Sequence, residues 1–72
     1  STSFDINVGQ AGNVSVMVYS LNGQLIDMIH NGSMDAGTYN MTWNGDNVSS
    51  GMYIIKASNA GITTSQKVML VK

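Results

Sequence analysis

The chain has 72 residues, no cysteine and a formal net charge of −1, which arises from four Asp and three Lys. This length allows one small domain of marginal stability, and the absence of cysteine excludes disulfides and cysteine-ligated metal sites. Positive charge this sparse argues against nucleic-acid binding and against a polybasic membrane patch, because both need clustered Lys or Arg.

The first third of the chain alternates between apolar and polar residues with the two-residue period of β-strands. The run 3–8 places Phe4, Ile6 and Val8 on one face. The run 13–21 places Val14, Val16 and Val18 on one face, and Met17, Tyr19 and Leu21 on the other. Because this second run is apolar on both faces, we expect a loop or a neighbouring domain to cover the side that carries Met17 and Tyr19.

Asn22-Gly23 separates the second run from the third, residues 24–29. Asn-Gly favours a type I′ turn, in which both central residues have positive φ, so we predict a β-hairpin here. Asn31-Gly32 is predicted to break the third strand. His30 directly precedes that break, and we expect a solvated turn histidine rather than a metal ligand or a general base.

The aromatic residues Tyr39, Trp43 and Tyr53 share alternating positions with aliphatic residues in the runs 38–43 and 52–57. We therefore predict that they belong to the core rather than to a sugar-binding platform. In the polar loop between these runs, Asn44, Asp46 and Asn47 favour Asx turns. A calcium site in this loop is the alternative, although calcium loops usually carry several acids and a closing Glu.

The run 64–71 is the last predicted strand, and short strands at about ten-residue spacing predict an all-β sandwich or barrel formed by residues 1–72 as a single domain. No pair of carboxylates has the spacing of a glycosidase, and no serine has a base partner. The glycine-bearing turns "GQAGN" and "GSMDAG" are not phosphate-binding loops. We therefore expect a protein without catalytic activity and without a cofactor.

The order of the motifs resembles that of a bacterial immunoglobulin-like module. "NVSVMVYSLNGQLIDMI" resembles its strand–turn–strand unit, "GSMDAGTYNMTWNGDN" its Gly-to-Trp segment, and "SSGMYIIKASNAGITTSQKVMLVK" its closing segment. Two families share this order: the C-terminal sorting domain of type IX secretion cargo proteins, and the immunoglobulin-like domain of the flagellar hook-capping protein. Arg, which is common in both families, is absent here.

The resemblance implies an antiparallel immunoglobulin-like β-sandwich of six to seven short strands. For the sorting family it also implies a C-terminal module of a larger secreted protein, exported through the periplasm of a Gram-negative bacterium to the medium or the cell surface. Its partners would be the outer-membrane translocon, a sorting peptidase and an upstream cargo domain. A homodimer through an edge strand is a further expectation, because a free edge can pair with its twin.

Carried over by position, the recognition elements are two residues near the start of the fifth strand and the end of the last strand: Gly51, Tyr53, Lys67, Val68, Met69, Leu70, Val71 and Lys72. The last strand could be offered to a receptor by β-augmentation. A structural role competes with recognition, since Gly51 and Tyr53 also suit a turn and a core anchor. Two alternative functions are a structural spacer next to a secreted enzyme and a carbohydrate-binding module.

Overall fold

The computed structural model describes residues 1–71, which form six strands and no helix. These residues therefore contain no helix that is long and apolar enough to cross a membrane. The strands are β1 (Thr2–Val8), β2 (Gly12–Ser20), β3 (Leu25–Met34), β4 (Gly37–Trp43), β5 (Gly51–Asn59) and β6 (Ile62–Leu70).

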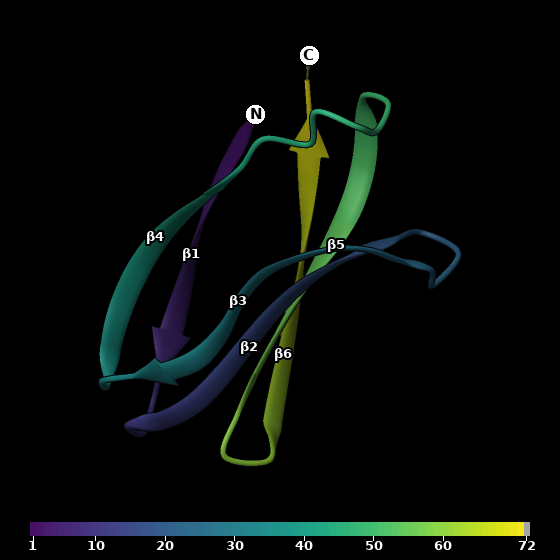
Figure 1. Ribbon diagram of the computed structural model, residues 1–72. Helices are drawn as coiled ribbons and strands as arrows, with labels where there is room; N and C mark the ends of the chain where they lie inside the picture. Colours follow the sequence, from purple (N-terminus) through teal and green to yellow (C-terminus); the bar gives the residue numbers. More distant parts are fainter. Residues whose placement is uncertain (72) are drawn as a thin grey trace.

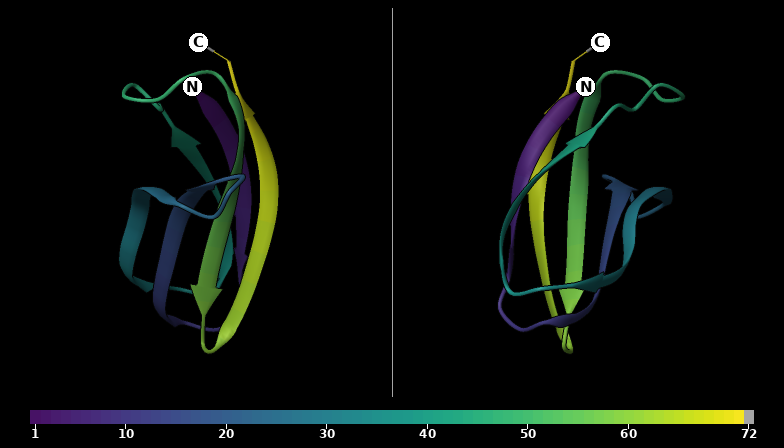
Figure 2. Two further views of the ribbon diagram at one scale, coloured as in Figure 1. Left: turned by 90° about the vertical axis from the view of Figure 1, so that its right-hand side faces the viewer. Right: turned by 60° about the vertical axis from the view of Figure 1, so that its left-hand side comes forward.

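The strands form two antiparallel sheets, one with the order β1-β4 and one with the order β3-β2-β5-β6. The sheets lie face to face, which confirms the predicted all-β sandwich (Figures 1 and 2). β6 is the last strand of the larger sheet and approaches β1, where Gln66 Nε2 donates a 2.9 Å hydrogen bond to the Asp5 carbonyl oxygen. The start of β1 and the end of β6 lie at the same end of the sandwich (Figure 1).

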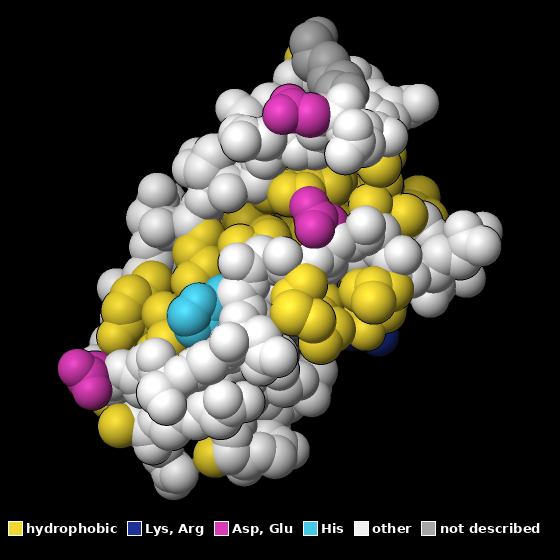
Figure 3. Space-filling view, viewed as in Figure 1, with side chains coloured by type: hydrophobic (Ala, Val, Ile, Leu, Met, Phe, Trp, Pro, Cys, Tyr) yellow, Lys and Arg dark blue, Asp and Glu magenta, His cyan; other side chains and the backbone are white. Residues whose placement is uncertain are grey.

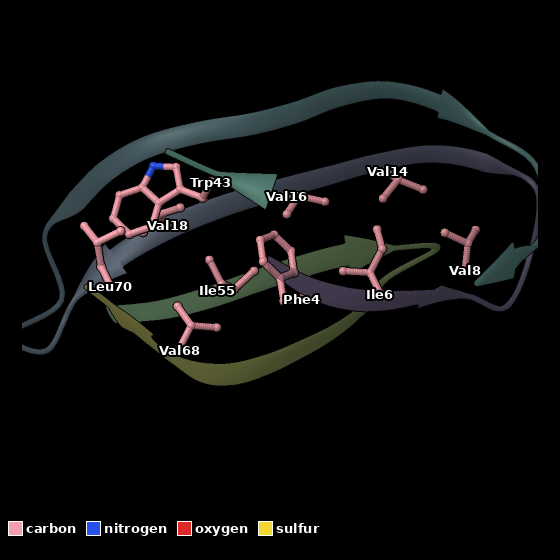
Figure 4. Close-up of a cluster of buried hydrophobic side chains, with 10 residues drawn as sticks. All are labelled: Phe4, Ile6, Val8, Val14, Val16, Val18, Trp43, Ile55, Val68 and Leu70. Atoms are coloured by element: carbon pink, nitrogen blue, oxygen red, sulfur yellow. The ribbon is translucent and has the colours of Figure 1, made fainter. Parts of the chain in front are cut away.

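The core follows the predicted alternation. In β2, Val14, Val16 and Val18 are 1%, 0% and 0% exposed, so the whole strand packs one face into the interior. The buried side chains come from both sheets and point toward one another (Figure 4). They are Phe4, Ile6, Val8, Val14, Val16, Val18, Trp43, Ile55, Val68 and Leu70.

The hairpin between β2 and β3 is confirmed, but the predicted type I′ turn is wrong. The loop has three residues, and it is closed by hydrogen bonds from Gly23 N to Ser20 O (3.0 Å) and from Ser20 N to Gln24 O (2.9 Å). Only Gly23 has positive φ, at +92°, whereas Asn22 does not. A type I turn followed by a glycine bulge has this pattern, because its longer loop needs positive φ only at the third residue.

The predicted break at Asn31-Gly32 is also wrong, because β3 continues to Met34. Asn31 pairs with Ser15 and Gly32 with Val14, so the ladder needs these residues extended. His30 is therefore a strand residue rather than a turn residue, and its Nε2 atom is buried without a hydrogen-bond partner. Because β3 is longer than the stretch of β2 with which it pairs, two register shifts interrupt the β2–β3 ladder.

The tightest turn joins β5 to β6 at Ala60-Gly61. Asn59 pairs with Ile62, which leaves a two-residue loop, and φ is +53° at Ala60 and +79° at Gly61. These values define the type I′ turn that the sequence suggested for Asn22-Gly23. Ala60 is the only non-glycine residue with positive φ in residues 1–71, and its Cβ makes that conformation unfavourable.

We expect Ala60→Asn to stabilise the domain by about 1 kcal/mol, because Asn tolerates the left-handed conformation better than Ala. For a domain of this size, thermal unfolding should shift upward by about 4–8 °C. Ala11→Asn is the matched control, since Ala11 is also an exposed turn alanine but has negative φ. An equal shift in both variants would contradict the assignment of strain to residue 60.

Candidate recognition site

The predicted recognition segment at the end of the chain divides between the two faces of β6. Val68 and Leu70 point inward and are 8% and 0% exposed, whereas Met69 is 56% exposed and Lys67 is also exposed. Val71 follows the strand and is exposed as well. Lys72 lies outside the described residues. Only alternate residues of the segment are therefore accessible to a receptor while the domain stays folded.

Leu70 is covered by the loop that joins β4 to β5, residues 44–50. At Gly45, φ is +62°, and a Cβ atom built there would clash with Leu70 Cδ2. Gly45 is itself buried, and its carbonyl oxygen accepts a 3.3 Å hydrogen bond from Val48 N. The loop can close over the last core residue because position 45 has no side chain.

Tyr53 is half-buried and has both a packing role and a hydrogen-bonding role. Its ring meets the Trp43 ring edge to face, with centroids 4.9 Å apart and an interplanar angle of 75°. Its hydroxyl donates a 2.7 Å hydrogen bond to the Ser49 carbonyl oxygen, four residues earlier. Tyr39 makes the same kind of bond to the Asp35 carbonyl oxygen at 2.6 Å. Each tyrosine thus fixes the loop that precedes its strand, as tyrosine corners do in immunoglobulin-like folds.

Trp43 is held by an acid whose role the sequence prediction missed. Trp43 is 3% exposed, and its Nε1 donates a 3.0 Å hydrogen bond to Asp27 Oδ2. The other oxygen of Asp27 accepts a 2.8 Å hydrogen bond from Met28 N. A buried indole N–H needs a hydrogen-bond acceptor. The aspartate inside the apolar run "LIDMI" was the sequence signal that could have identified this acceptor.

Gly51 begins β5 with φ of +154°, in a region that side chains rarely adopt, and it pairs with Leu70. This backbone conformation suits the turn role that was expected of Gly51 as the alternative to recognition. Gly51 and Tyr53 thus lie beside Val68 and Leu70, since Tyr53 pairs with Val68 in the same ladder. The structure brings together most of the predicted recognition residues, but by contacts that also serve folding.

The calcium alternative concerned the loop oxygens of Asn44, Asp46 and Asn47. These residues line a shallow cleft of about 330 Å³ together with Asp27. Within residues 1–71, no group of three or more His, Cys, Asp or Glu side chains is placed to hold a metal ion.

A second cleft, of about 310 Å³ and mostly apolar, opens between the end of β1 and the β5–β6 turn. Val8 and Ile62 are among its lining residues. No predicted recognition residue that the structure describes lines this cleft.

The model of the secretion system C-terminal sorting domain matches residues 1–72. The chain belongs to this family of type IX sorting domains. Of the two families suggested by the motif order, the match is to the sorting family. No curated protein and no solved structure matches the chain. Membership assigns the chain a role as a C-terminal secretion sorting signal, which acts with a secretion machinery in a secreted or cell-surface bacterial protein.

Gly45→Ala should destabilise the sorting domain by about 2 kcal/mol, because the new Cβ meets a fully buried Leu70 and the left-handed φ disfavours alanine. Urea unfolding followed by tryptophan fluorescence measures the change. Gly9→Ala is the control, because a Cβ there meets nothing within 4 Å and φ is not positive. Equal stability of the two variants would contradict the contact between the loop and Leu70.

Tyr53→Phe should lower the free energy of unfolding by about 1 kcal/mol through loss of the hydrogen bond to Ser49. Tyr53→Ala should lower it by about 3 kcal/mol, because the ring contact with Trp43 is lost as well. Thermal unfolding of both variants separates the two contributions. A Phe variant as unstable as the Ala variant would show that the hydroxyl, rather than the ring, anchors the strand.

Proposed function

We propose that the chain is the non-catalytic sorting module of a type IX cargo protein, and that the outer-membrane translocon recognises it after export to the periplasm of a Gram-negative bacterium. A sorting peptidase then removes the module from its cargo. The observation that carries this proposal is the family match over residues 1–72. The position of β6 at the end of the larger sheet supports it, because an end strand can be approached by a receptor.

A structural spacer is the second candidate. It is favoured by the internal contacts of Gly45, Tyr53 and Leu70, which give the family motifs a folding role without any receptor. A carbohydrate-binding module has less support. Trp43 is buried, Tyr39 and Tyr53 pack against the core, and none of the three forms an open aromatic platform.

A fusion of residues 1–72 to a periplasmic reporter, expressed in a type IX-competent bacterium, tests the sorting role. We expect the reporter to reach the medium or the cell surface. Removal of residues 67–72 should retain it in the periplasm. Because that deletion also removes Val68 and Leu70 from the core, the Gly45→Ala fusion is the control: it is destabilised but keeps the whole tail.

Export of the Gly45→Ala fusion with retention of the truncated fusion would support sorting by the tail. Retention of the unaltered fusion would refute the sorting role and leave the spacer.

A further inference from the structure

The outer face of the four-stranded sheet carries a continuous group of apolar side chains. The strand registers place Met17 opposite Met28, Tyr19 opposite both Leu25 and Ile54, and Met52 opposite Met69. We call this group the methionine face, and it consists of Met17, Tyr19, Leu25, Met28, Met52, Ile54 and Met69.

Much of the methionine face is accessible to solvent. Leu25 is 55% exposed, Met28 46%, Met52 36% and Met69 56%. It spans all four strands, so it is a surface rather than an edge. Within residues 1–71 no loop covers these exposed side chains, so of the two coverings expected for the side with Met17 and Tyr19 the neighbouring domain stays a prediction. Contiguous exposed apolar side chains of this kind mark interaction sites.

The positive charge of the described residues is concentrated on this same face. Lys56 pairs with Met17, and Lys67 pairs with Ile54, so both lysines point outward among the apolar side chains. The Lys56 Nζ atom lies 4.8 Å from the centroid of the Tyr19 ring. The methionine face therefore combines apolar surface with two ammonium groups.

The four aspartates lie elsewhere. Asp27 pairs with Val18 on the inward side of β3 and binds Trp43, and Asp5 lies on β1, where it binds Asn40. Asp35 and Asp46 lie in connections between strands. Figure 3, seen from the side of β3 and β4, shows acidic side chains prominently and lysine only at the margin. Within residues 1–71, the two lysines and the four aspartates thus lie on different sides of the domain.

We infer that the methionine face docks onto a protein of the secretion machinery whose contact surface is apolar and bears carboxylates that pair with Lys56 and Lys67. This inference rests on the proposed sorting function. Methionine suits such a surface because its flexible, polarisable side chain adapts to the shape of a partner. Charge complementarity would orient the encounter, and the apolar contacts would supply most of the affinity.

The charge pattern disfavours a second copy of the chain and a lipid membrane. Two copies packed face to face would bring their lysines together, and head-to-tail packing would set the methionine face against the polar outer surface of β1 and β4, which includes Asp5 and Thr38. An anionic membrane is disfavoured because two lysines on a flat sheet provide little electrostatic attraction to lipid.

A single cysteine introduced into this cysteine-free chain can carry a photo-crosslinker. Met52→Cys is the informative position, because β5 is a central strand and a label there reports a partner across the face rather than at the β6 edge. Thr38→Cys on the outer surface of β4 is the matched control. Each chain is labelled with a thiol-reactive benzophenone and irradiated with solubilised outer membranes of a type IX-competent bacterium.

We expect one protein adduct from the Met52→Cys chain and none from the Thr38→Cys chain. Unlabelled chain should compete for the adduct, and the K56R/K67R variant should compete equally because it keeps both positive charges. The K56E/K67E variant should compete about tenfold less well or worse, because its carboxylates would face those of the partner. Circular dichroism of both double variants checks that the exposed substitutions leave the fold intact.

Adducts with lipid, or adducts of twice the mass of the chain, would replace the inference with a membrane or a second copy. Equal competition by both double variants would also overturn it. The reporter fusion separates this failure from failure of the sorting role. If the K56E/K67E fusion is exported as well as the unaltered fusion and Met52→Cys gives no adduct, only the docking face is wrong. If the unaltered fusion is retained, both proposals fail.

Discussion

The burial of Leu70 beneath the 44–50 loop is the constraint on which the rest of this sandwich depends. Leu70 is fully buried, and the loop reaches it only because residue 45 is a glycine with positive φ. The same loop is tied to β5 by the Tyr53 hydroxyl, and Tyr53 rests on Trp43, which Asp27 holds from β3. One end of the core is thus closed by contacts among four strands and a loop.

This closure gives the residues of β6 two separate tasks. Val68 and Leu70 complete the core, while Lys67 and Met69 join the outer face of the sheet. Alternation along a strand makes the two tasks independent, because successive side chains point to opposite faces. The outward residues of β6 can therefore vary without loss of the packing that keeps the strand in place.

Much of the fold was predictable, because period-two alternation specifies which side of each strand is buried. Val14, Val16 and Val18 are examples, and Trp43 also lies in the core as expected. Turn details were less predictable, because Asn22-Gly23 suits more than one loop length and the β2–β3 register decides between them. Asn31-Gly32 resembled a break, but the length of β2 requires a partner strand there. The role of Gly45 could not be predicted, since it depends on contact with a residue 25 positions later.

The position of Leu70 also bears on synthesis. The strands of the smaller sheet, β1 and β4, pair although they are far apart in the sequence. β6 then adds the last inward side chains of the core. A ribosome that has not yet translated residue 70 holds a polypeptide whose hydrophobic interior is still open at one end. A truncated product would keep that opening. The domain can therefore reach its compact folded state only after the last strand has been translated.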